Sequence, residues 1–249
     1  MKQSSILNKL SMLFALSLLL LGFYSCEDDN YALPEETLKG KIIDKDTGET
    51  LQTEIGGNGI RIRMMEYSWS DTPQPYDFYC MMDGTFNNTK IFKGTYGITP
   101  AGAFVPLQET EPIEIKGVKE LNFEVEPFLR IQWIGEPVAN SDGTISAKAV
   151  ITRGTANSDY QKNLLDIYLF VNEIPYVGNM SFDNRYTPSM SFSGATGNVV
   201  LGQELPMTTK GTLTKNRTYY IRVGARIDQT IEGAKRFNYS TIKEVYVPE

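Results

Sequence analysis

Residues 121–133 have the sequence LNFEVEPFLRIQW, in which a proline separates two short stretches of alternating polarity. The alternating apolar side chains are Leu121, Phe123 and Val125 before Pro127, and Leu129, Ile131 and Trp133 after it. A period of two is typical of a β-strand that buries one face. Because proline cannot donate a hydrogen bond to a strand ladder, Pro127 ends the first stretch. The segment therefore predicts two β modules that meet at Pro127.

The strand pattern extends from this segment back toward the N-terminus. Apolar side chains recur with strand-like spacing at residues 38–43, at Ile60, Ile62 and Met64, at Phe78, Cys80 and Met82, and at residues 91–92, 96–98 and 113–115. Asp83 and Gly84 give a turn signal after the third of these groups. We predict a β-sandwich over residues 37–127.

The residues after Pro127 predict a second module, residues 128–249. A turn is expected at residues 140–143, with further strands at residues 145–151, 165–171, 219–225 and 242–247. Residues 174–207 are rich in Gly, Pro, Asn and Ser but hold scattered aromatic residues, so we expect long loops around short strands rather than disorder. The predicted fold class is all-β, with two β-sandwich domains.

The N-terminus has the pattern of an export signal. Lys2 and Lys9 precede an apolar run at residues 10–23, and Ser25 stands directly before Cys26. The run is too short to span a bilayer comfortably, and a small residue before a cysteine is typical of a lipoprotein signal. We predict a signal peptide at residues 1–25, lipid attachment at Cys26 and an acidic tether over residues 26–36. The alternative is an ordinary secretory signal with an incidental cysteine.

The acidic cluster Glu27, Asp28 and Asp29 follows the predicted lipid attachment residue. It resembles the surface-export signal of lipoproteins from gut-type Gram-negative bacteria. The alternative is an acidic linker that only keeps the segment next to the lipid anchor solvated. We therefore expect a protein that is lipid-anchored in the outer membrane and faces the cell exterior.

The composition excludes several classes of function. The chain has 249 residues, 24 Lys and Arg against 30 Asp and Glu, and a net charge of −6, which argues against binding to nucleic acid. It contains no histidine, which removes imidazole-based catalytic triads and the usual zinc and copper sites. Chemistry on paired carboxylates survives, but no such pair stands out, so we expect a protein that is not an enzyme and needs no cofactor. If Cys26 carries lipid, Cys80 is left without a disulfide partner.

Two groups of motifs resemble known β-sandwiches. The segment from Gly40 to Leu51, with Asp83-Gly84-Thr85-Phe86 and Lys93-Gly94-Thr95-Tyr96, resembles the transthyretin-like or carboxypeptidase-regulatory-like sandwich. The segment from Leu213 to Val223 is similar to the fibronectin type III strand and its preceding tyrosine corner, with Lys215 in place of the usual proline.

The two modules behind a lipoprotein signal resemble the two-domain lipoproteins of the domain-of-unknown-function 3823 family. The resemblance implies an accessory component of a starch-utilisation-type glycan uptake system, in which an outer-membrane transporter works with surface lipoproteins. It implies a polysaccharide or oligosaccharide and a transporter complex as partners. The family carries no catalytic motif that could be transferred to this sequence.

The segment 66–79 is the candidate ligand-binding region. It concentrates aromatic, carboxylate and amide side chains, among which we select Tyr67, Trp69, Asp71, Gln74 and Tyr76. Sugar rings stack on exposed aromatic rings while their hydroxyl groups bond to carboxylates and amides, so this composition predicts a glycan platform. The alternative is that Trp69 and Tyr76 pack over an open sheet edge while Phe78 lies in the core.

Two further interpretations stay open at this point. Asp44 and Asp46 have calcium-like spacing, but a following Thr47-Gly48 is more typical of a turn than of a metal site, so we predict no metal. The whole protein could also be a structural, assembly or adhesive spacer lipoprotein that binds no glycan.

Overall fold

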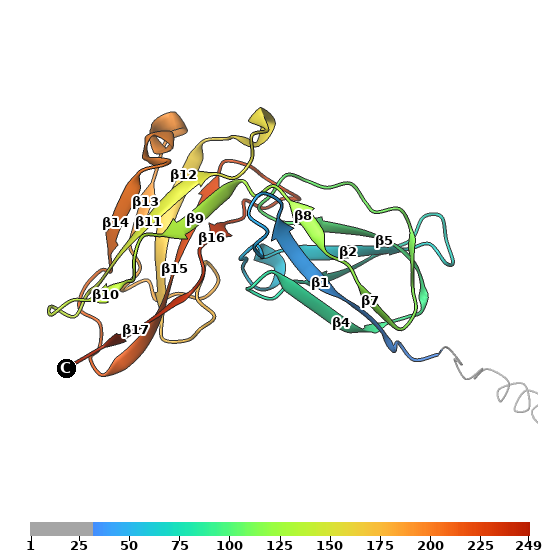
Figure 1. The fold of residues 1–249 in the computed structure, drawn as a ribbon, viewed down its shortest axis with the longest axis horizontal. Helices are drawn as coiled ribbons and strands as arrows, with labels where there is room; N and C mark the ends of the chain where they lie inside the picture. Colours follow the sequence, from blue (N-terminus) through green and yellow to red (C-terminus); the bar gives the residue numbers. More distant parts are fainter. Residues whose placement is uncertain (1–31) are drawn as a thin grey trace, which may run out of the picture. The chain divides into compact units, whose positions relative to one another are not determined.

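The computed structural model describes residues 32–249, and Figure 1 shows the fold. The predicted signal peptide at residues 1–25, the lipid attachment at Cys26 and the first part of the predicted tether lie outside the described residues. Strands dominate the described part, which confirms the predicted all-β class of β-sandwich domains. Within residues 32–249, no helix has the length and apolar character needed to cross a membrane.

The first sandwich uses the chain up to Val125. Its elements are β1 (Glu36–Asp44), the 3-10 turn η2 (Gly56–Asn58), β2 (Arg61–Glu66), β3 (Pro75–Tyr79), β4 (Thr85–Ile91), β5 (Gly94–Ala101), β6 (Ile113–Ile115), β7 (Val118–Glu120) and β8 (Phe123–Val125). One sheet has the order β4-β1-β7, with β8 also paired to β1, and the other has the order β3-β2-β5-β6. The inward-facing side chains of both sheets form one core, which includes Leu38, Ile42, Ile62, Met64, Phe86, Ile98 and Phe123.

The predicted strand that contains Phe78, Cys80 and Met82 ends earlier than expected. Strand β3 stops at Tyr79, because the chain then turns at Asp83 and Gly84, where Gly84 has a φ of 78°. Cys80 is nevertheless buried in the core and forms no disulfide. Burial raises the pKa of its thiol to about 12, so it is an unreactive core side chain.

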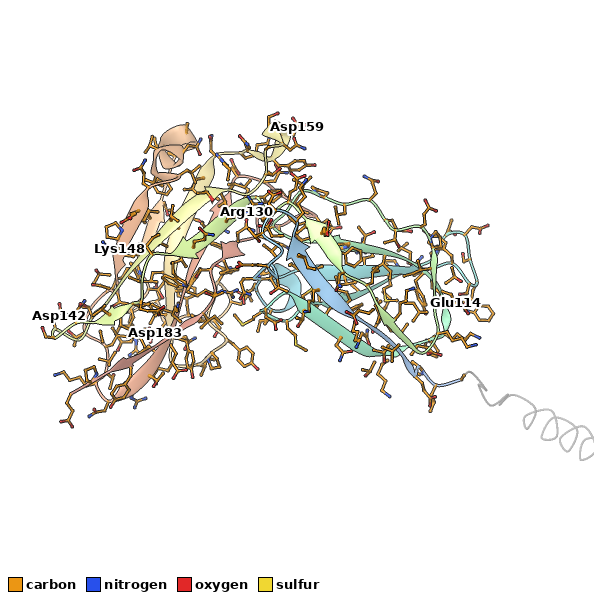
Figure 2. The ribbon with its side chains drawn as sticks, viewed as in Figure 1. Glu114, Arg130, Asp142, Lys148, Asp159 and Asp183 are labelled. Atoms are coloured by element: carbon orange, nitrogen blue, oxygen red, sulfur yellow. The ribbon has the colours of Figure 1, made fainter. Side chains whose placement is uncertain are left out.

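Asp44 and Asp46 form the turn that the sequence predicts, and the turn also holds the second sandwich. The Asp44 carboxylate accepts a hydrogen bond from the Asp46 amide, as in an Asx turn. Both carboxylates also pair with Arg130, which donates to Asp44 Oδ1 at 2.8 Å and to Asp46 Oδ2 at 2.6 Å. Arg130, labelled in Figure 2, belongs to the first strand after Pro127. The carboxylates thus bind a guanidinium of the neighbouring module.

The second sandwich begins directly after Pro127. Its elements are β9 (Leu129–Trp133), β10 (Val138–Ala139), β11 (Ile145–Arg153), η3 (Ser158–Tyr160), β12 (Leu164–Asn172), β13 (Ser189–Ser191), η4 (Gly194–Val200), β14 (Glu204–Thr208), β15 (Arg217–Ile227), β16 (Asn238–Tyr239) and β17 (Lys243–Val247). One sheet contains β9, β10, β11 and β14, and the other has the order β13-β12-β15-β16, with β17 also paired to β15.

Tyr219 forms the tyrosine corner that the sequence predicts. Its side chain is fully buried, and its hydroxyl accepts a hydrogen bond from the Thr214 amide at 3.0 Å. The residues from Ile174 to Met207 form loops around β13, η4 and the start of β14, also as predicted. From these loops, Val177 and the partly buried Phe182 pack with Phe170, Phe237 and Tyr239 in a second, mostly aromatic cluster, separate from the core between the two sheets.

The two sandwiches share buried polar contacts. Arg222 on β15 is 0% exposed and donates to the backbone carbonyls of Ser240 at 2.9 Å and of Thr53, in the first sandwich, at 2.8 Å. Glu54 is 1% exposed and accepts a hydrogen bond from the Tyr239 hydroxyl at 2.9 Å. Buried polar groups need such partners, so these contacts hold the two modules together in one arrangement.

Candidate functional site

The loop between β2 and β3 displays Trp69 to solvent. The Trp69 side chain is 78% exposed, and among the described residues no aromatic ring pairs with it. Its loop is nevertheless braced against β5, because the Tyr67 amide donates to the Thr95 carbonyl at 2.8 Å and the Thr95 amide donates to Ser68 Oγ at 2.7 Å. The loop therefore presents a single large aromatic surface from a fixed base.

Tyr67 lies at the foot of this loop and is partly buried. Its hydroxyl donates a hydrogen bond to Glu109 Oε1 at 2.8 Å. That bond raises the pKa of Tyr67 above its ordinary value of 10.0, so the phenol remains protonated at neutral pH. Tyr67 thus braces the loop on its other side, and its hydroxyl already has a protein partner.

Tyr76 covers the open edge between the two sheets. It lies on the edge strand β3, is 48% exposed, and packs at 6.3 Å from the ring of Phe78. Its hydroxyl accepts a hydrogen bond from Asn88 Nδ2, across the gap to β4, at 3.0 Å. Phe78 packs against the core. Tyr76 and Phe78 thus pack against the sheet edge and the core, as the alternative to a glycan platform predicts. Trp69 does not pack in this way and lies in solvent.

Asp71 and Gln74 are exposed in the same loop as Trp69. The sequence-selected residues therefore fall into two groups. Trp69, Asp71 and Gln74 are free side chains of one loop, while Tyr67 and Tyr76 anchor its two ends. Among residues 32–249 there is no cluster of carboxylate or cysteine side chains that could hold a metal ion.

A second candidate region lies between the modules, and sequence analysis did not select it. A cleft there has a cavity of about 90 Å³, lined by the segment that follows the Asp44 turn and by β9. Burial alone would raise the pKa of Asp44, but hydrogen bonds from Arg130 and from backbone amides outweigh it and hold this pKa below the ordinary 3.8. Asp44 is therefore ionised at neutral pH. Only the folded contact between the modules brings these residues together, which explains why no local signal reveals them.

Comparison with known proteins assigns the family. The N-terminal domain described as protein of unknown function (DUF3823) matches residues 36–126. The crystal structure of a DUF3823 family protein from Bacteroides uniformis ATCC 8492 is 35% identical in sequence, covers 86% of this chain and 100% of its own, and superposes with a TM-score of 0.79. The chain belongs to the DUF3823 family. The resemblance drawn from the sequence motifs is thereby confirmed at the level of the family.

Other solved structures share the fold at lower identity. A putative carbohydrate binding protein from Bacteroides uniformis ATCC 8492 is 22% identical with a TM-score of 0.69, and covers 86% of this chain and 100% of its own. A DUF3823 family protein from Parabacteroides merdae ATCC 43184 is 20% identical with a TM-score of 0.65, at the same coverage. Among curated proteins, none matches the chain.

Proposed function

We propose that this DUF3823 protein is a non-catalytic, carbohydrate-binding accessory lipoprotein in polysaccharide capture. In this proposal Cys26 carries the lipid anchor, the protein faces the cell exterior from the outer membrane, and it works beside an outer-membrane transporter. The observation that carries the proposal is the exposure of Trp69, at 78%, on a loop that is braced by Tyr67 and Ser68 at one end and by Tyr76 at the other.

The chemistry of this loop suits a sugar. An aromatic face attracts the C–H face of a pyranose ring, and the bracing means that little loop entropy is lost on binding. The carboxylate of Asp71 and the amide of Gln74 lie in the same loop and offer acceptors and donors to sugar hydroxyl groups. The description of one fold relative as a putative carbohydrate binding protein supports the same class of ligand.

The electrostatics of the cleft exclude Asp44 as the general acid of a glycosidase. A glycosidase needs one carboxylic acid whose pKa is raised so that it can protonate the leaving group. The cleft carboxylate Asp44 has a lowered pKa, because Arg130 and backbone amides stabilise its charged form. It therefore has the opposite protonation from that of a general acid.

We expect Trp69→Ala to weaken glycan binding by about ten-fold, since a stacked aromatic contributes on the order of 1 to 2 kcal/mol. The melting temperature should stay nearly unchanged, because the side chain is exposed. Affinity electrophoresis in gels containing single polysaccharides measures the first effect, and thermal unfolding followed by circular dichroism measures the second.

Tyr176→Ala is the matched control, because Tyr176 is also an exposed aromatic residue, at 57%, but belongs to a loop of the second module. It should leave glycan binding unchanged. The proposal is wrong if the wild-type protein is retained by no polysaccharide in a broad panel, and the Trp69 assignment is wrong if both variants bind like wild type.

The anchor is tested separately through Cys26. Two or three acyl chains give stable membrane attachment that a single chain cannot, and all of them depend on this thiol. We expect Cys26→Ala to convert the membrane-bound protein into a soluble periplasmic species or to leave the signal peptide uncleaved. Membrane fractionation measures this, and retention in the membrane, at the wild-type level, of a variant whose signal peptide has been cleaved contradicts lipid attachment.

Docking of one end of the first sandwich against the membrane surface is the second candidate function, and one observation favours it. The pairing of Glu36 with Ile91, and of Thr37 with Val118, places the start of β1 at the same end of the sandwich as the exposed Phe92 and Val118. The Trp69 loop is bonded to Thr95 at this end as well. Exposed aromatic residues partition into membrane interfaces. Binding of Trp69→Ala to lipid vesicles, compared with wild type, separates this role from glycan binding.

A further inference from the structure

The cleft between the two sandwiches has a fixed shape. Arg130 pairs with Asp44 and Asp46 across it. Tyr239 lines the cleft, and its hydroxyl donates a hydrogen bond to the buried carboxylate of Glu54. A site that is held open by contacts of this kind needs little rearrangement on binding, and ligand sites occur preferentially at interfaces between domains.

The side chains around the cleft are mainly polar. Leu51, Leu129 and Ile131 also line it, but their side chains belong to the cores of the two sandwiches. Gln52 from the first module and Gln132 from the second stand on the rim. Within residues 32–249 we find no hydrogen bond to either amide side chain. The two amides are therefore available as both donors and acceptors.

The charges around the cleft select against an anion. Asp44 and Glu49 line the cleft. The guanidinium of Arg130 also lines it, but it is already paired with the carboxylates of Asp44 and Asp46. Negative charge thus exceeds positive charge around the cavity, and an acidic ligand would be repelled. An uncharged ligand with several hydroxyl groups matches the two amides on the rim, which can both donate and accept hydrogen bonds.

The volume limits the ligand further. The cavity of about 90 Å³ is larger than the ~10–15 Å³ that one water needs, and smaller than the ~300 Å³ at which pockets for drug-sized ligands begin. It therefore suits a single ring or side group rather than several sugar residues. We propose that the cleft between the modules binds one residue of a neutral glycan, with Gln52 and Gln132 as its hydrogen-bonding residues. This inference rests on the proposed glycan-binding function and adds a second subsite to it.

The experiment compares amide variants of the full mature chain in affinity gels of soluble starch, mixed-linkage β-glucan and polygalacturonate. We expect a neutral polysaccharide to retain the wild-type protein and the anionic polygalacturonate not to. Gln132→Ala and Gln52→Ala should each weaken binding by about 3- to 10-fold, the loss that corresponds to one hydrogen bond. Gln203→Ala is the matched control, because Gln203 is an exposed glutamine distant in sequence from the cleft-lining segments.

The outcomes separate this inference from the proposed function. If a neutral glycan binds and Trp69→Ala weakens it while both cleft variants bind like wild type, the cleft is not a subsite and the proposed function stands. Preferential retention by polygalacturonate also overturns the neutral-ligand assignment. If no polysaccharide retains the wild-type protein, the proposed function fails and the subsite with it. Unchanged melting temperatures of the variants verify that each loss is a loss of binding.

Discussion

We expect Arg222→Ala to lower the free energy of unfolding by about 3 to 5 kcal/mol, because it removes a large buried side chain and leaves its acceptors unpaired. The guanidinium is 0% exposed, donates to carbonyls of Thr53 and Ser240, and lies 4.2 Å from the centre of the Tyr239 ring. Burial lowers the pKa of Arg222 to about 10, so the group is still charged at neutral pH. Both the cavity and the orphaned carbonyls oppose folding in the variant.

Equilibrium unfolding in urea measures this loss. Trp69 is already solvent-exposed in the folded protein, so the change in tryptophan fluorescence reports mainly on Trp133 in the second module, whereas circular dichroism reports on both modules. Arg217→Ala is the control on the same strand, because Arg217 is 53% exposed and its pair with Glu173 contributes no more than about 1 kcal/mol. If the two variants lose equal stability, the buried guanidinium does not hold the modules together.

Arg222→Met adds a second comparison. Methionine retains much of the volume of the arginine stem but donates no hydrogen bond. It therefore separates the free-energy cost of the unpaired carbonyls from the cost of the cavity. We expect it to recover part of the stability that Arg222→Ala loses, and the remainder is the contribution of the hydrogen bonds.

Local periodicity was sufficient to predict most of the strands. A strand with one buried face has an apolar side chain at every second residue, and Tyr219, Ile221, Val223 and Ala225 follow this rule in the observed β15. Turn chemistry was equally readable, because the Asp44 carboxylate accepts from the Asp46 amide two residues on and Gly48 adopts a positive φ of 73°. These features depend on neighbours within a few residues, and one sequence contains that information.

The contacts between modules could not be predicted in this way. Arg222 occupies the face of β15 opposite to the core of its own sandwich, where alternation predicts a solvated side chain. It is buried because the first module supplies the carbonyl of Thr53, which is distant in sequence. The rim amide Gln132 is likewise an ordinary outward-facing residue of β9, and only the fold brings it to the same cleft as Gln52. Sequence also left the exposure of Trp69 open, because the packing of a hairpin loop depends on the strands around it.

Gly40→Ala should destabilise the protein by about 3 kcal/mol or more, through a clash rather than through backbone strain. Gly40 lies on β1 without a positive φ, so an alanine could adopt its backbone conformation. A Cβ atom at this position, however, would lie 1.8 Å from the carbonyl oxygen of Leu121 and 2.7 Å from the ring of Phe86. The backbone of the segment between β7 and β8 would have to move away from β1, which breaks packing across the first core.

Gly57→Ala is the matched control, because its Cβ would meet only the Tyr79 hydroxyl, at 4.0 Å. Alanine there replaces a flexible residue in a helical turn, so we expect a neutral or slightly stabilising effect. Urea unfolding of both variants, followed by circular dichroism, gives the comparison. A loss below about 1 kcal/mol for Gly40→Ala would mean that Leu121 can shift without cost. The glycine that opens the transthyretin-like motif would then need another explanation than the close approach of β1 to its neighbouring chain.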